Sequence, residues 1–299
     1  MASIFKNRYG EPRSGWPIAA GLILILIAQM ASYSFASDGR EDDIFLKIIV
    51  TLVYGILAVG GILLLFKLFY SRPLRQMGII KEGFFIELLH GFAIGAISTA
   101  LIFFVLIFSG EAQVLSMNQS RLFSTGIVIE LASVFTFVVS EELFARGLLM
   151  TALKTTRNKW VIILSSSLLF GLLHMINPGA TILSITNMCL GGLLLAYMFV
   201  KSGKLWLPIG YHIAVNFMTG DIFGMTVGAH TPQTTVFDTI IIGSNTLLSG
   251  GSIGPEGGLL LTGSIMLGLL YVRFVVKTPS GTVWTMSSDL PLMRGGKGK

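Results

Sequence analysis

Long apolar runs separated by short polar connections dominate this chain of 299 residues. An α-helix rises about 1.5 Å per residue, so roughly 20 apolar residues cross the hydrocarbon core of a bilayer. Such segments must be helical, because a helix satisfies its own backbone hydrogen bonds where water is absent. The sequence therefore predicts an all-α integral membrane protein, a bundle of about eight transmembrane helices. The predicted spans are residues 17–36, 44–70, 84–109, 125–153, 160–176, 181–200, 205–220 and 258–276.

The composition agrees with a membrane location and indicates an orientation. Charged residues make up 12% of the chain, about half the share in soluble domains, which is about 25%. The net charge of +6 arises from Lys and Arg in the N-terminus, in alternate connections and in the C-terminus, which is a topology signal and not one for nucleic acid. Basic connections stay on the cytoplasmic side, so both termini are expected in the cytoplasm. The single cysteine, Cys189, excludes an intramolecular disulfide.

The most unusual stretch is residues 140–150, where three charged residues lie inside an apolar span. A charge at membrane depth costs about 2.5–3.5 kcal/mol on insertion scales, so such residues tend to be paired and functional. Glu142 and Arg146 are four residues apart and can form an ion pair on one face. Glu141 points about 100° away from Glu142, so we expect it to face a different place and to be free for chemistry or for a second polar partner.

Two further polar pairs lie inside later spans. Phe170 and His174 share one face of the fifth span, and His212 and Asn216 share one face of the seventh. Counting from the basic connections places Glu141, His174 and His212 roughly 10–21 Å deep, at overlapping depths once helix tilt is allowed for. We therefore predict one buried pocket that holds two carboxylates, two imidazoles, a guanidinium and an amide.

This set of side chains suits hydrolysis by two routes. A buried carboxylate can act as general base towards water, and a histidine and an asparagine can donate hydrogen bonds to an oxyanion. Alternatively, Glu141, His174 and His212 form a His2Glu set for catalytic zinc, with water as the fourth ligand. The sequence contains no HExxH motif, so zinc and metal-free hydrolysis both stay open. A purely structural ion pair and hydrogen-bonded core histidines are the alternative to any chemistry.

These residues resemble the CPBP family of intramembrane proteases, which includes CAAX prenyl endopeptidases of the Rce1 type and the Abi, or bacteriocin self-immunity, proteins. The EExxxR motif corresponds to residues 141–146, FxxxH to residues 170–174 and HxxxN to residues 212–216. The similarity covers about residues 126–217, together with the Gly-Pro-Glu-Gly-Gly run at residues 254–258. Each motif alone is weak, but three in this order on successive spans are specific.

The resemblance implies an intramembrane endopeptidase that acts on a membrane-associated peptide or protein, with lipidated substrates and cleavage near a C-terminus among the options. It implies that Glu141 and His174 activate water, that His212 and Asn216 stabilise the oxyanion, and that Glu142 and Arg146 brace the site. A metalloprotease is the form we predict, with zinc bound by Glu141, His174 and His212, and metal-free activation of water as the alternative. The partners are the bilayer and the substrate, without nucleic acid.

The resemblance also implies a domain organisation and a competing function. We expect a single polytopic membrane domain over residues 1–299, with a protease core at about 125–276 and a flexible cytoplasmic tail at 277–299. Residues 221–257 are predicted to be a loop or a re-entrant segment, and Glu256 a turn residue with substrate contact as the alternative.

Compact loops favour a prokaryotic cell membrane. The competing function is a non-enzymatic bacteriocin-immunity or scaffold protein.

Overall fold

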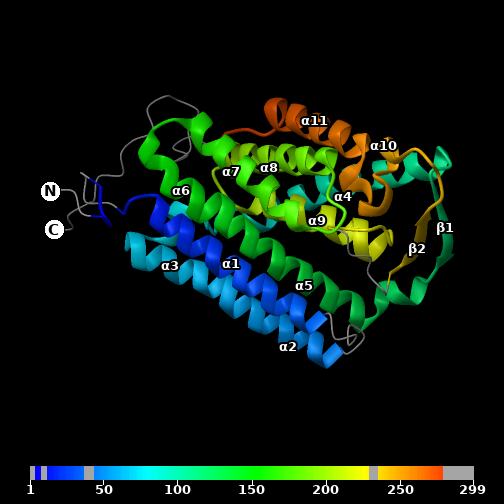
Figure 1. Ribbon diagram of the computed structural model, residues 1–299, viewed down its shortest axis with the longest axis horizontal. Helices are drawn as coiled ribbons and strands as arrows, with labels where there is room; N and C mark the ends of the chain where they lie inside the picture. Colours follow the sequence, from blue (N-terminus) through cyan, green and yellow to red (C-terminus); the bar gives the residue numbers. More distant parts are fainter. Residues whose placement is uncertain (1–3, 8–11, 37–43, 229–234, 279–299) are drawn as a thin grey trace.

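The computed structural model describes residues 4–7, 12–36, 44–228 and 235–278 and shows a mostly helical protein. Helices α1–α3 and α5 run side by side along one side of the molecule, and α7, α8 and α11 lie on the other (Figure 1). The α-helices are α1 Gly15–Ala36, α2 Ile44–Tyr54, α3 Gly61–Tyr70, α4 Phe84–Phe108, α5 Thr125–Glu142, α6 Met150–Leu153, α7 Lys159–Leu173, α8 Ile182–Ser202, α9 Trp206–Phe217, α10 Thr246–Ser249 and α11 Leu259–Phe274.

Each predicted apolar run is helical, but not every run is a demonstrated membrane span. Among the described residues, 4 helices are long and apolar enough to cross a bilayer: Phe45–Tyr70, Phe84–Phe108, Lys159–Ile176 and Ile182–Ser202. The first of these is continuous because the π-helical segment Gly55–Gly60 joins α2 to α3. Two shorter apolar helices are Gly15–Met30 and Leu259–Phe274. The structure thus supports a multi-pass membrane protein, while the count of eight spans and the cytoplasmic termini stay predictions.

The outward faces of the long helices are apolar. On α7, the exposed residues Leu164, Leu168 and Leu172 recur every fourth position, which makes a stripe along one side of the helix. Polar and charged side chains are instead found inside, and Glu142 and Arg146 are 0% exposed. A contiguous apolar surface is rare on soluble monomers and is the surface that a lipid environment favours.

Helices α4 and α9 cross in close contact because glycines line their interface. A Cβ atom on Gly210 of α9 would lie 2.0 Å from the carbonyl oxygen of Leu88 on α4. A Cβ atom on Gly91 of α4 would lie 2.1 Å from the carbonyl oxygen of Leu207 on α9. Small residues let the two backbones approach, as in other membrane helix pairs. This contact fixes α9, which carries His212 and Asn216.

A two-stranded antiparallel sheet is the main departure from the predicted all-α fold. Strand β1 Ala112–Met117 pairs with β2 Phe237–Ile241, and Ala112 lies opposite Ile241. The register shifts between Val114 and Ser116, which marks a β-bulge. Figure 1 shows the sheet at one end of the helices. It ties the connection after α4 to the segment after α9, so the segment containing Ile240 forms a strand there and not a re-entrant helix.

Other expectations about the chain ends and boundaries stay predictions. The tail at residues 279–299 lies outside the described residues, as do residues 229–234 of the predicted long loop. A single domain over residues 1–299 and a core at 125–276 are neither confirmed nor contradicted by the helices themselves.

We expect Gly210→Ala to destabilise the protein, because the added methyl group would overlap the Leu88 carbonyl and force α4 and α9 apart. Overpacking of this kind costs about 1–3 kcal/mol. The matched control is Gly263→Ala in α11, where an added Cβ meets nothing within 4 Å. Thermal unfolding in detergent should show a lower Tm for Gly210→Ala only, and equal Tm values for both variants would contradict the tight crossing.

Candidate functional site

The helix that carries both glutamates changes its geometry at the site. Helix α5 ends at Glu142, a π-helical segment follows at Leu143–Leu149, and α6 completes the run. Serine 124 caps the start of α5 by accepting a hydrogen bond from the backbone N–H of Ile127 at 3.3 Å. The sequence indicated an uninterrupted α-helix here. A π-helical turn within an α-helix is rare and often occurs at functional sites.

Glu142 and Arg146 form the predicted ion pair. Nη1 of Arg146 donates to Oε1 of Glu142 at 2.8 Å, and both side chains are 0% exposed. Removing charges from water is costly, so a buried pair is stable only when further hydrogen bonds satisfy its remaining groups. Arg146 has such a bond, since its Nη2 donates to the Gly192 carbonyl of α8 at 3.1 Å.

Helix α8 can approach Arg146 because Gly192 has no side chain. A Cβ atom there would lie 3.0 Å from Cα of Ser167 and 3.2 Å from Cβ of Phe170. The ring of Phe170 packs under the guanidinium, whose carbon lies 4.7 Å from the ring centroid. Such a cation–π contact favours the cation where water is excluded. Arg146 is therefore held by α8 and α7 as well as by its own helix.

His212 lies between the two glutamates. Its Nδ1 is 3.0 Å from Oε1 of Glu142, and because an ionised carboxylate only accepts, Nδ1–H is the donor. Its Nε2 is 3.7 Å from Oε2 of Glu141. The two glutamates point in different directions, as their positions on the helix predict. Because an imidazole carries nitrogens on different edges, both carboxylates still approach the same ring.

Glu141 and His174 line one cavity together. Its other lining residues come from α1, the Glu141 helix and α7, and include Gln29 and Ser166. The Glu141 carboxylate interacts electrostatically with His212 and with His174. Its Oε2 atom is buried and has no hydrogen-bond partner among the described protein groups. A carboxylate oxygen without a protein donor, beside two imidazoles, can accept a hydrogen bond from water.

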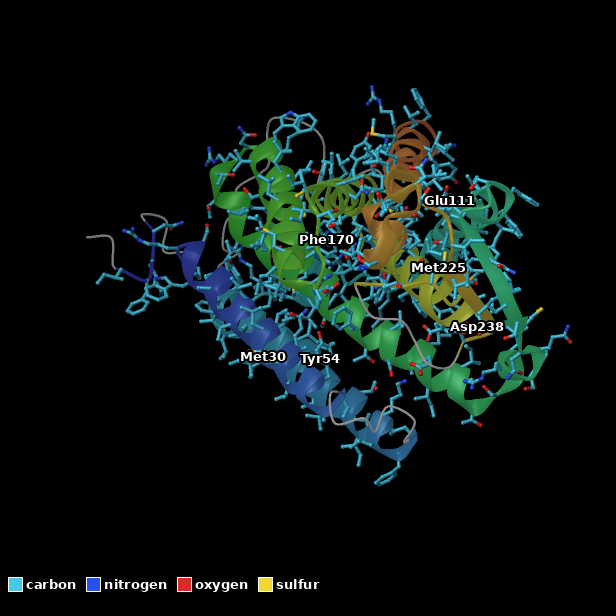
Figure 2. All side chains as sticks on the ribbon, turned by 45° about the vertical axis from the view of Figure 1, so that its right-hand side comes forward. Met30, Tyr54, Glu111, Phe170, Met225 and Asp238 are labelled. Carbon is cyan, nitrogen blue, oxygen red and sulfur yellow. The ribbon has the colours of Figure 1, made fainter. Side chains whose placement is uncertain are left out.

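His174 is at the end of α7, where the helix changes to the 3₁₀ turn His174–Ile176. Its Nδ1 lies 2.7 Å from the Phe170 carbonyl oxygen, so Nδ1–H donates and Nε2 is left for another partner. The Phe170 ring lies 4.7 Å from the His174 ring and 5.8 Å, edge to face, from the His212 ring. Phe170, near the middle of the molecule in Figure 2, thus contacts both histidines and Arg146.

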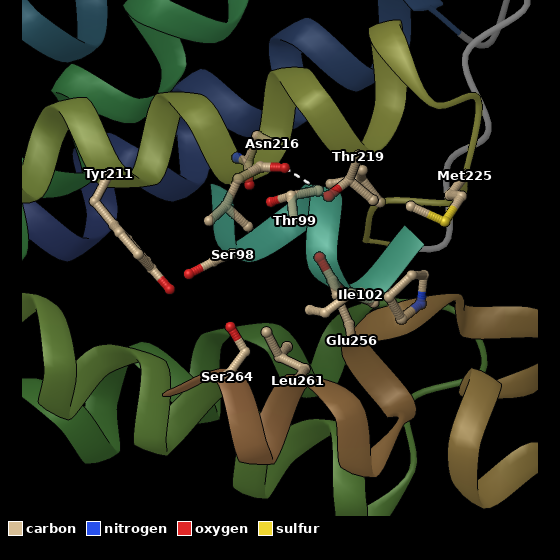
Figure 3. A pocket seen from close by; sticks show the side chains of 13 residues that line it. Ser98, Thr99, Ile102, Tyr211, Asn216, Thr219, Met225, Glu256, Leu261 and Ser264 are labelled. Carbon is tan, nitrogen blue, oxygen red and sulfur yellow. Dashed lines mark hydrogen bonds between the residues drawn. The ribbon is translucent and has the colours of Figure 1, made fainter. Parts of the chain in front are cut away.

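Asn216 does not line the Glu141 cavity. It lines a second cavity between α4, α9 and α11, together with Tyr211, Thr219 and Glu256 (Figure 3). Asn216 is one helical turn from His212 on α9, so the two residues share a face but open onto different spaces. Of the six predicted residues, the structure brings five together near Phe170, whereas Asn216 lines the other cavity.

A catalytic zinc ion needs three protein side chains close enough together to bind it. Within the described part of the chain, no group of three or more His, Cys, Asp or Glu side chains is placed to hold a metal ion. The protonated Nδ1 of each histidine leaves Nε2 available, which is the tautomer of many metal-bound histidines. Because no such group is found among the described residues, we derive no step through zinc, and the metalloprotease form stays a prediction.

Two aromatic residues have contacts at the site that the sequence does not predict. The Tyr54 hydroxyl on α2 and Oγ of Ser140 are hydrogen-bonded at 2.7 Å, next to Glu141. No local signal singles out Tyr54, because it lies on another helix 86 residues earlier. The FxxxH spacing identifies Phe170 as a neighbour of His174 but does not predict its contacts with Arg146 and His212.

The comparisons with known proteins agree with the three motifs. Residues 123–218 match the family described as type II CAAX prenyl endopeptidase Rce1-like. This region runs from the residue before Ser124 through the π-helical segment, α7 and α8 to the end of α9, and so contains all six predicted site residues. No curated protein and no solved structure matched the chain.

We expect Arg146→Met to destabilise the protein strongly, because it leaves Glu142 charged, buried and short of its main partner. Removing one member of a buried pair costs about 3–5 kcal/mol, whereas replacing both members with apolar groups is often near neutral. The double variant Glu142→Leu/Arg146→Met should therefore unfold at a higher temperature than Arg146→Met alone. If it unfolds at a lower temperature, the pair is not the dominant interaction of Arg146.

Proposed function

Because residues 123–218 form an Rce1-like domain of the type II CAAX prenyl endopeptidase family, we propose that this protein is an intramembrane endopeptidase. Its substrate is a membrane-associated peptide or protein, lipidated or cut near its C-terminus. The observation that carries the proposal is the placement of Glu141. One of its carboxylate oxygens is buried without a hydrogen-bond donor among the residues that the structure describes, in a cavity shared with His174.

The proposed reaction begins with the activation of water. Glu141 accepts a proton from water, and His174 Nε2 orients the same water, while the water oxygen attacks the carbonyl carbon of the scissile bond. The carbonyl oxygen becomes an oxyanion, which Asn216 and a protonated Nε2 of His212 stabilise. The C–N bond then breaks, and Glu141 returns its proton to the leaving nitrogen. The products are a carboxylic acid and an amine, and transfer of the remaining water proton from the acid to the amine gives a carboxylate and an ammonium group.

Glu142 and Arg146 have a positioning role in this scheme. Glu142 accepts from Nδ1 of His212 at 3.0 Å, which fixes the ring so that Nε2 faces Glu141. Arg146 holds the Glu142 carboxylate at 2.8 Å. A misplaced catalytic group can cost a large factor in rate, so this bracing is expected to matter for turnover as well as for stability.

A second function is supported by the same ion pair. The contacts of Arg146 with Glu142, Gly192 and Phe170 hold three helices together whether or not any bond is cut. A non-enzymatic immunity or scaffold protein would need these contacts for its stability alone. It would also keep its biological activity when Glu141 and His174 are both replaced.

We expect Glu141→Gln to abolish peptide cleavage while the protein still folds, because an amide cannot accept a proton from water. Turnover should fall by about 10²-fold or more, the usual contribution of general-base catalysis. The assay is mass-spectrometric detection of new peptide termini, using full-length protein in liposomes with a library of apolar membrane-inserted peptides. Glu82→Gln, at an exposed residue, is the matched control. Cleavage by Glu141→Gln at the native rate would refute the proposal.

The metalloprotease form makes a separate prediction about metal content. It expects close to one zinc per protein in detergent, and loss of this zinc in His212→Ala. Elemental analysis of the purified chain needs no substrate. Background zinc in both proteins, prepared without chelator, would contradict the metalloprotease form and leave Glu141 and His174 as the groups that activate water.

A further inference from the structure

The Gly-Pro-Glu-Gly-Gly run before α11 is a tightly built turn. Gly254 has φ +81°, and a Cβ atom there would lie 2.5 Å from the Thr226 carbonyl oxygen. A Cβ atom on Gly258 would lie 2.3 Å from the Leu248 carbonyl oxygen. Neighbouring backbone therefore surrounds the glycines closely, and Glu256 is the residue of the run that carries a long polar side chain.

A buried asparagine holds this turn in place. Asn187 on α8 is 0% exposed, and its Nδ2 donates to the carbonyl oxygens of Glu256 and Gly258, each at 2.9 Å. Its Oδ1 accepts from Oγ1 of Thr262 on α11 at 2.6 Å. Satisfied networks of buried polar groups rigidify their surroundings. Asn187 thus fixes the backbone that carries the Glu256 side chain.

The Glu256 carboxylate lies at the second cavity, opposite Asn216 of α9 and Thr219 of the π-helical segment Met218–Ile222 (Figure 3). It accepts a hydrogen bond from the Gly228 backbone and interacts electrostatically with His174 and His212. Among the described residues that line this cavity, Glu256 alone has a charged side chain. The polar neutral lining residues are Ser98, Thr99, Tyr211, Asn216, Thr219 and Ser264.

This lining determines what kind of group the cavity favours. Hydroxyl groups can donate or accept, but a carboxylate gains most from a charged donor. Burial raises the pKa of the Glu256 carboxyl, and the charges of His174 and His212 lower it. A cation bound next to Glu256 would supply the stabilisation of the carboxylate that burial removes.

We propose that the cavity of Asn216 and Glu256 is an acidic substrate subsite that takes a protonated nitrogen. This inference rests on the proposed endopeptidase function, in which Asn216 binds the carbonyl oxygen of the scissile bond. The part of the substrate on one side of the scissile bond, its flank, then occupies the cavity next to Asn216. Two sources of protonated nitrogen fit this flank: a lysine or arginine side chain, and the new amino group of the leaving fragment.

The test measures binding in full-length Glu141→Gln protein in nanodiscs, so that turnover does not interfere. One labelled pair is an apolar peptide with a single lysine and the same peptide with glutamine. The other pair is a short peptide with a free amino terminus and its acetylated form. We expect about tenfold tighter binding of at least one protonated member, since charge-assisted hydrogen bonds are about twice as strong as neutral ones. The pair that shows the preference identifies the source.

Adding Glu256→Gln should remove this preference, while adding Glu82→Gln at the exposed control position should not. The glutamine keeps an oxygen for the Gly228 hydrogen bond, and an unchanged Tm will show that the turn is intact. If the Glu256→Gln protein keeps the same preference for the protonated peptide, the proposal is overturned. It is also overturned if neither pair of peptides shows a preference. Cleavage of the same peptides by native protein, compared with Glu141→Gln, tests the proposed function separately.

Discussion

The buried contact between Arg146 and Glu142 is the interaction on which the other parts of the site depend. Glu142 holds His212 of α9, while Arg146 reaches Gly192 of α8 and lies over Phe170 of α7. A charge pair inside a low-dielectric environment is stable only with all of these partners present. Four separate segments must therefore pack together before the pair gains these partners.

The residues of the candidate site line two chemically different cavities. Glu141 and His174 line one cavity, whose other walls are mostly apolar. In the other cavity, Asn216 and Glu256 lie among hydroxyl groups. A scissile bond placed beside His212 would have the water-activating groups on one side and the oxyanion donor on the other. This division follows from the position of His212 and Asn216 one turn apart on α9, which its close contact with α4 keeps fixed.

The sequence predicted the features that depend on local pattern. The helical runs followed from uninterrupted apolar stretches, and the Glu142–Arg146 pair followed from its spacing. The features it did not predict depend on residues far apart in the chain. Strands β1 and β2 pair across more than a hundred residues, and their own alternation of apolar residues is weak. The position of Asn216 in another cavity depends on how α9 is rotated against α4 and α11, which no spacing within α9 determines.

The π-helical segment Leu143–Leu149 should respond differently to the deletion and to the insertion of one residue. A π-helix has more residues per turn than an α-helix, so Leu143–Leu149 contains residues that an α-helix would not accommodate in the same rise. Deleting one residue there could restore regular α geometry, whereas an insertion would add to the surplus. The deletion would leave the orientation of α6 relative to α5 nearly unchanged, whereas the insertion would rotate α6. The segment should therefore tolerate the loss of one residue better than the gain of one.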